Sequence, residues 1–172
     1  MEELQVRAAA IIALLGASLC GCSSGGTVPN ARFQLEGSLS VVMDLGFDDC
    51  VIDTTSPDEL SVRFVRTRGA TMDTPLKIVW AQAGQVLNTP STIDLAEARP
   101  DDPNRQRSIV SRNVLDDKRS VFPKLVRGKM SFFDQLRSDS TVKGQFNITF
   151  ENGIDFANGR TVYGSFTAKV PP

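Results

Sequence analysis

Apolar and polar residues alternate along much of this chain, and a period of two is the signature of a β-strand with one buried face. The longest such stretch covers 33–45. Its apolar positions are Phe33, Leu35, Leu39, Val41, Met43 and Leu45, with Gly37 as the only gap. The alternation therefore predicts a long, half-buried strand over 33–45. Further strands are predicted at 60–64, 76–80, 91–95, 125–133, 142–150 and 161–170.

A second pattern, apolar-x-Gly-x-apolar-x-apolar, recurs in these stretches. Its glycines are Gly37, Gly128, Gly144 and Gly164. Each shares parity with inward apolar residues, so each is expected to leave room for a large neighbour or to let the strand bend. Because the first copy lies near the start of the domain and the rest near its end, the first strand is expected to pair close to the C-terminal strands. We predict an all-β fold, an antiparallel β-sandwich, with a short closed β-barrel as the alternative.

The stretches between the predicted strands carry turn and loop signals. Residues 46–59 are acidic and turn-rich, and 96–107, with two prolines and mixed charge, is expected to be an exposed loop. Residues 111–119 are expected to form a short helix or a strand connection. The pairs Asn152-Gly153 and Asn158-Gly159 favour tight turns.

The amino-acid composition excludes several classes of catalytic and metal sites. The 172 residues contain no histidine, which excludes Ser-His-Asp and Cys-His nucleophile arrangements and His-ligated metal sites. The net charge is −1. A nearly neutral surface has no field to concentrate polyanions, so nucleic acid is not an expected partner. The cluster Arg63, Arg66 and Arg68 is accordingly predicted to be a solvated strand face and turn.

The N-terminus resembles the signal peptide of a bacterial lipoprotein. An uncharged apolar run over 8–19 is too short to span a bilayer. It leads into Leu19-Cys20-Gly21-Cys22, which resembles the lipobox, and Ser-Ser-Gly-Gly follows. The alternative interpretation is a buried N-terminal helix of the domain.

The resemblance implies a helical signal peptide over 1–21, a flexible tether over 22–30 and one all-β domain over 31–172. It also implies diacylglycerol and a fatty acyl group on Cys22, which would anchor the protein to a membrane of the cell envelope. Ser23 after the cysteine implies the outer membrane by the habit of that family. Without residues 1–21 the chain keeps 18 basic and 18 acidic side chains.

Cys50 and Trp80 are single residues that could have either a structural or a functional role. If Cys20 leaves with the signal and Cys22 carries lipid, Cys50 has no partner within the chain. It is expected to be a buried thiol, with an intermolecular disulfide as the alternative. Trp80 shares parity with Ile78 and is expected in the core rather than at a ligand.

The acidic residues between 44 and 59 are the best candidates for a metal site. Calcium is bound by clustered carboxylate and carbonyl oxygens, and Asp48, Asp49 and Asp53 are the expected ligands. The spacing matches no EF-hand, so solvated turn carboxylates are the competing interpretation.

These observations lead to an expected function. We expect a lipid-anchored structural or adaptor component without catalytic activity, which holds an envelope protein at the membrane. The alternative is a ligand-binding module, using calcium through the segment 44–59 or a small apolar molecule in a barrel interior.

The lipobox interpretation predicts the outcome of replacing Cys22. The variant Cys22→Ala should not be acylated and should accumulate as the unprocessed precursor, because the thiol is the acceptor. Mass spectrometry of the protein from envelopes measures both effects. Maturation of the variant to the ordinary polypeptide length would show that the interpretation is wrong.

Overall fold

The computed structural model describes residues 33–82 and 87–172, and every helix-or-strand element within them is a β-strand. The predicted signal peptide, the tether and Cys22 lie outside the described residues. The strands are β1 (Phe33–Gln34), β2 (Gly46–Phe47), β3 (Asp49–Asp53), β4 (Glu59–Arg68), β5 (Thr71–Ala81), β6 (Ser91–Asp94), β7 (Ser108–Asn113), β8 (Leu125–Phe132), β9 (Thr141–Phe150) and β10 (Thr161–Lys169). Nothing in the described part of the chain is a helix suited to crossing a membrane.

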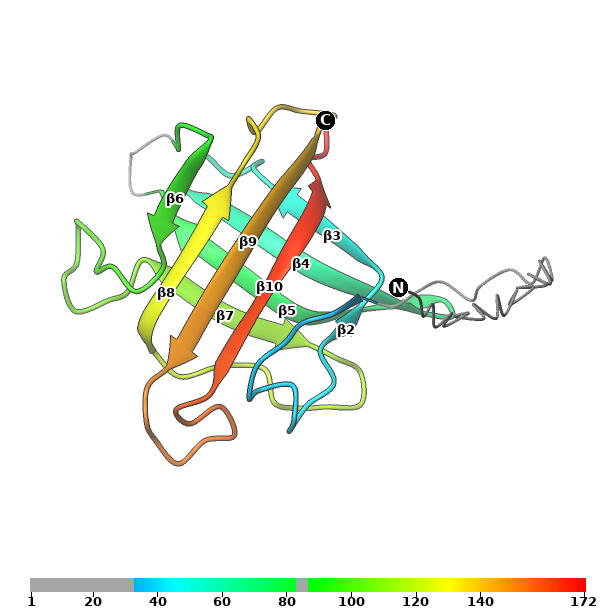
Figure 1. The fold of residues 1–172 in the computed structure, drawn as a ribbon, viewed down its shortest axis with the longest axis vertical. Coiled ribbons are helices and arrows are strands. Elements are labelled where there is room, and N and C mark those ends of the chain that lie inside the picture. Colours follow the sequence, from blue (N-terminus) through cyan, green and yellow to red (C-terminus); the bar gives the residue numbers. More distant parts are fainter. Residues whose placement is uncertain (1–32, 83–86) are drawn as a thin grey trace, which may run out of the picture.

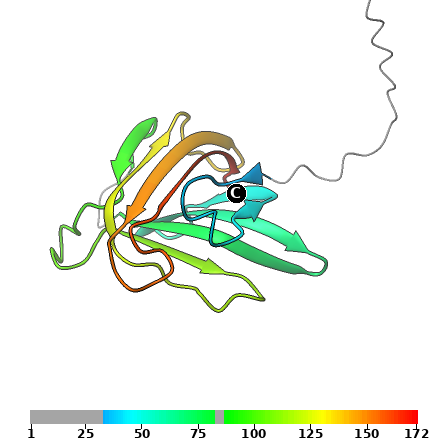
Figure 2. The ribbon, with the colours of Figure 1, turned by 60° about the horizontal axis from the view of Figure 1, so that its bottom comes forward.

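Eight strands form one sheet in the order β6-β8-β9-β10-β3-β4-β5-β7, and β1 and β2 form a separate two-stranded ribbon. The large sheet folds over between β10 and β3, so that β6, β8, β9 and β10 make a front layer and β3, β4, β5 and β7 make a rear layer (Figures 1 and 2). The strands of the two layers cross at an angle. This arrangement confirms the predicted all-β sandwich.

The pairing departs from a purely antiparallel sheet at one place. All the strand pairs are antiparallel except β10 and β3, which are parallel and aligned at Lys169 and Val51. Strands β6 and β7 end the sheet and do not pair with each other in the described residues. The sheet is therefore open, and the closed-barrel alternative is not what the structure shows.

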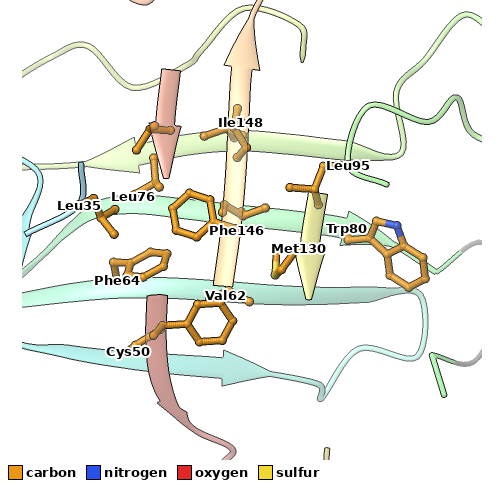
Figure 3. Close-up of a cluster of buried hydrophobic side chains, with 14 of the residues drawn as sticks. Leu35, Cys50, Val62, Phe64, Leu76, Trp80, Leu95, Met130, Phe146 and Ile148 are labelled. Atoms are coloured by element: carbon orange, nitrogen blue, oxygen red, sulfur yellow. The ribbon is translucent and has the colours of Figure 1, made fainter. Parts of the chain in front are cut away.

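The core lies between the layers, where inward side chains from both sides meet. In β9 every second residue is buried, as the alternation predicts. Phe64 of β4 faces Phe146 of β9 with ring centroids 5.4 Å apart and Phe166 of β10 at 6.1 Å. Figure 3 shows Phe64 and Phe146 facing each other across the cluster, with Trp80 at its border. Trp80 is buried as expected, and the Arg107 guanidinium lies 4.4 Å from its ring centroid.

The glycine prediction is confirmed for the three strand positions. A Cβ on Gly144 would collide with the ring of Phe166, its cross-strand partner, and would lie 2.6 Å from the carbonyl oxygen of Ser131. A Cβ on Gly164 would lie 2.7 Å from Leu35 Cδ2, and one on Gly128 would lie 3.1 Å from Leu95 Cβ. In each case the missing side chain makes room for a large apolar neighbour.

The predicted long strand over 33–45 is wrong. Only Phe33–Gln34 is a strand; the chain then turns at Gly37, whose φ is 111°, and continues through further turns. Leu39 and Met43 are buried, but Val41, which has the same parity, is 81% exposed. Leu35, Leu39 and Met43 are buried at intervals of four, and that spacing satisfies an alternating pattern as well as a series of turns. Period two alone therefore misidentified the segment.

Two further expectations agree with the structure. The N-terminal segment does pair with the C-terminal strands, since Glu36 and Tyr163 exchange hydrogen bonds of 2.9 and 3.0 Å. The segment 111–119 contains the end of β7 and a turn in which Val114 bridges Asp117, so it is a strand connection rather than a helix.

The packing at Gly144 predicts a stability effect. Gly144→Ala should lower the free energy of unfolding by about 1–3 kcal/mol, because the added methyl group overpacks the core against Phe166 and a backbone carbonyl that cannot move away. Urea denaturation measures the loss. Gly153→Ala is the matched control, since nothing lies within 4 Å of the position of its Cβ. Equal effects of the two substitutions would contradict the packing argument.

Candidate binding pocket

A pocket of about 410 Å³ opens where β10 and β3 separate. Its walls combine residues from β10, β9, the β1–β2 ribbon and the start of β3. The lining residues are Phe33, Phe47, Asp48, Asp49, Cys50, Phe133, Lys143, Gly144, Ser165, Phe166 and Thr167. We call this set the β10 pocket.

The pocket exists because the link between the two layers is short. Strands β10 and β3 are aligned only at Lys169 and Val51. Earlier in β10 the strand is not aligned with β3, and the β1–β2 ribbon contributes Phe33 and Phe47 to the lining of the pocket. Figure 1 shows β2 close to β10 and β3. Phe33 and Phe47 are paired across that ribbon, with ring centroids 5.5 Å apart. The ribbon thus supplies an aromatic wall.

Four phenylalanines line the pocket, and two of them are exposed. Phe47, Cys50 and Phe166 are buried at its base, whereas Phe33 is 60% and Phe133 is 52% exposed. Exposed phenylalanines that border an apolar cavity are typical of a contact surface, because their burial on binding releases free energy. The arrangement suits an apolar group entering from solvent.

Charged residues line part of the pocket. Asp49 Oδ2 accepts a hydrogen bond from Lys169 Nζ at 2.7 Å, and Asp49 Oδ1 accepts one from the Cys50 amide at 2.9 Å. Asp48 Oδ2 accepts from the Thr67 amide at 2.8 Å. The exposed Lys143 stands on the β9 side. An entering group therefore meets carboxylates beside the start of β3 and a cation on β9.

Cys50 is a buried thiol, as expected. Burial, with the nearby Asp49 charge adding to it, raises the pKa of Cys50 to about 12. The thiol therefore stays protonated at neutral pH and is a poor nucleophile. Its sulfur would have to leave the core before two chains could be joined by a disulfide.

The predicted calcium ligands do not converge. Asp53 accepts hydrogen bonds from the Thr55 amide at 3.0 Å and from the Thr55 hydroxyl at 2.7 Å, while Asp48 and Asp49 have the partners given above. Within 33–82 and 87–172, no group of three or more Asp, Glu, His or Cys residues is arranged to hold a metal ion. The geometry therefore offers no observation in favour of the calcium site, which stays a prediction.

The structure contains a buried ionic cluster around Arg66 and Asp73 that the sequence pattern did not predict. Arg66 was expected on a solvated face, but it is only 1% exposed and pairs with Asp44 and with Asp73 Oδ2 at 3.1 Å. Asp73 also binds Arg68 Nε at 2.9 Å and the Leu115 amide at 3.1 Å. The parity of Arg66 was the available signal, because it continues the inward series of Leu60, Val62 and Phe64 along β4. The positive charge of Arg66 instead favoured the incorrect prediction of a solvated position.

No family model, no curated protein and no solved structure matches this chain.

The ionic cluster predicts a pH dependence of stability. Burial alone would raise the pKa of Asp73, but the Leu115 amide and the guanidinium groups of Arg66 and Arg68 together lower it. A lowered pKa in the folded state adds stability above the usual carboxyl pKa of about 4, and that stability is lost as the pH falls further. Asp73→Asn should thus cost about 3 kcal/mol near neutral pH, because it leaves Arg66 short of a counter-charge.

The difference between this variant and the unmodified protein should shrink as the pH falls from about 4 toward 2. Urea denaturation at a series of pH values measures it. The control Asp155→Asn, at an exposed position, should change stability by less than about 0.5 kcal/mol. A constant difference across this range would contradict the assignment.

Proposed function

We propose that this chain is a lipid-anchored component of a bacterial cell envelope that holds a partner protein at the membrane through the β10 pocket. The anchor is the lipid on Cys22 implied by the lipobox resemblance. The observation that carries the binding role is the aromatic pocket, whose mouth presents Phe33 and Phe133 to solvent. The proposed role is binding and positioning, without catalysis, and the outer membrane is the proposed location.

The proposed anchor lies close in sequence to one wall of the pocket. Phe33, which lines the pocket, follows Cys22 by a stretch that reaches at most about 40 Å when fully extended. A partner seated in the pocket would therefore be held within roughly that distance of the lipid surface. This short reach suits a protein that retains its partner beside the membrane.

A second candidate is supported by the size and lining of the same pocket. A volume of about 410 Å³ lies within the range of small-molecule sites, roughly 300–1,000 Å³, and such sites are mostly apolar. The bound species would then be a small apolar molecule. The expected barrel interior is not its place, because the space between the layers is filled by core side chains.

Photo-crosslinking in cells tests the proposal and separates the two candidates. The full-length chain carries p-benzoylphenylalanine in place of Phe133, at the pocket mouth. The control chain carries it in place of Ile154, which is fully exposed on another loop. We expect a discrete protein adduct from position 133 and none from position 154, measured by gel shift and mass spectrometry.

The adduct mass identifies the kind of bound species. An adduct heavier by a whole polypeptide supports the adaptor role, and one heavier by a few hundred daltons supports the small-molecule candidate. No adduct at position 133, or the same adducts from both positions, would contradict binding at the pocket. The protein adduct should also weaken when Cys22→Ala removes the anchor.

A further inference from the structure

Strand β10 has one fully paired edge and one interrupted edge. Along the first edge, β10 is aligned with β9 over its whole length, from Thr161 to Lys169. On the other edge, Tyr163 exchanges two hydrogen bonds with Glu36, and Lys169 is aligned with Val51. Between these two points no described strand is aligned with β10 on that side.

The main-chain groups in this gap can be assigned from the pairing around it. Amide and carbonyl groups of successive residues in a strand point to opposite edges. Since Tyr163 directs both groups away from β9, Ser165 and Thr167 direct theirs the same way. No described strand is aligned with either residue on that edge, and neither main chain bonds there to a described loop or turn residue. Within 33–82 and 87–172, the gap is therefore a short length of strand edge without an aligned neighbour, and we call it the open edge.

The open edge borders the β10 pocket. Ser165, Phe166 and Thr167 all line it, with Phe33 and Phe47 across the opening. An occupant thus meets main-chain donors and acceptors beside an apolar cavity. An alkyl chain would fill the cavity but would leave the main-chain groups of the edge without hydrogen-bond partners. An extended peptide fills the cavity with a side chain and also pairs its backbone with the edge.

We propose that the partner of the β10 pocket is an extended peptide segment that pairs with β10 at Ser165 and Thr167 and inserts one large apolar side chain beside Phe33, Phe47 and Phe166. This inference rests on the proposed function and names the partner chemistry of the same site. The covered stretches at Tyr163 and Lys169 limit the paired part to a few residues. The short opening admits such a segment and blocks pairing along a full-length strand.

The probe is the capped heptapeptide acetyl-TTTFTTT-amide, with acetyl-TTTATTT-amide as its matched control. Binding to the full-length lipidated chain in nanodiscs is measured by fluorescence anisotropy of labelled peptides. The phenylalanine peptide should bind at least about tenfold more tightly than the alanine peptide, because only its ring fills the pocket. Methylating the peptide amide on either side of the central residue should weaken binding by about tenfold, because the edge loses a partner.

A pair of protein variants tests the edge itself. Ser165→Pro removes the amide that faces the gap, while Ser165→Ala removes only the hydroxyl. We expect about a tenfold loss of affinity for the proline variant and less than about twofold for the alanine variant. Thermal unfolding checks that both variants fold. If the proline variant does not fold, the methylated peptides test the same hydrogen bonds from the ligand side.

Hydrogen exchange gives a separate readout. In the free protein the amides of Ser165 and Thr167 should exchange faster than those of Phe166 and Ala168, and the phenylalanine peptide should slow both. Slow exchange in the free full-length chain would mean that the edge is already occupied, which would overturn the proposal. Binding that leaves both amides unprotected would overturn it as well.

The controls also separate this inference from the proposed function. Acetylphenylalanine amide that binds as tightly as the heptapeptide would overturn the peptide proposal and leave the small-molecule candidate. No heptapeptide binding, together with a protein adduct at position 133 in cells, would overturn the extended-peptide chemistry while the adaptor role stands. Loss of the adduct as well would remove both.

Discussion

The contact of Phe64 with Phe146 and Phe166 holds the two layers of this sandwich together. The layers belong to one sheet but share only the aligned pair Lys169 and Val51, so hydrogen bonds alone cannot fix their separation. Apolar burial between the layers has to supply the cohesion, and Phe64 reaches both C-terminal strands. Phe166 occupies its place only because Gly144, opposite it on β9, has no side chain.

Buried arginines lie near both ends of β5. Near its start, Asp73 accepts hydrogen bonds from Arg66 and from the backbone of Leu115. Near its end, Arg107 covers Trp80 and donates to the Ala81 carbonyl oxygen at 2.9 Å. These guanidinium groups are tolerated in the interior because each meets carboxylates or carbonyls there. Their cost in desolvation is offset only while those partners remain.

The same short link that makes the layers depend on Phe64 also creates the β10 pocket. Where β10 and β3 separate, the protein leaves an aromatic cavity and a short strand edge in one place. The β1–β2 ribbon, which follows directly from the N-terminal region, forms one wall of this opening. The proposed anchor at Cys22 is therefore only a short stretch of sequence away from Phe33, which lines the proposed binding surface. The domain would hold its partner close to its own point of attachment.

The sequence by itself determined the local features of this protein. Alternation located β4, β5, β8, β9 and β10, and the parity of Gly128, Gly144 and Gly164 showed where the core needs room. Those features depend on which face of a strand is buried, and a period of two reports that directly. The same logic placed Trp80 in the core, whereas the burial of Cys50 was expected from its lack of a partner cysteine.

Only the tertiary structure decided the rest. The turns after Gln34, the burial of Arg66 and the separation of β10 from β3 depend on partners distant in the chain. Glu36 finds Tyr163, and Arg66 finds Asp73, only once the layers have packed. Alternation indicates that a side chain faces inward, but it does not identify the residues that this side chain contacts. The pocket is therefore a property of how the strands pair, and no single stretch of sequence encodes it.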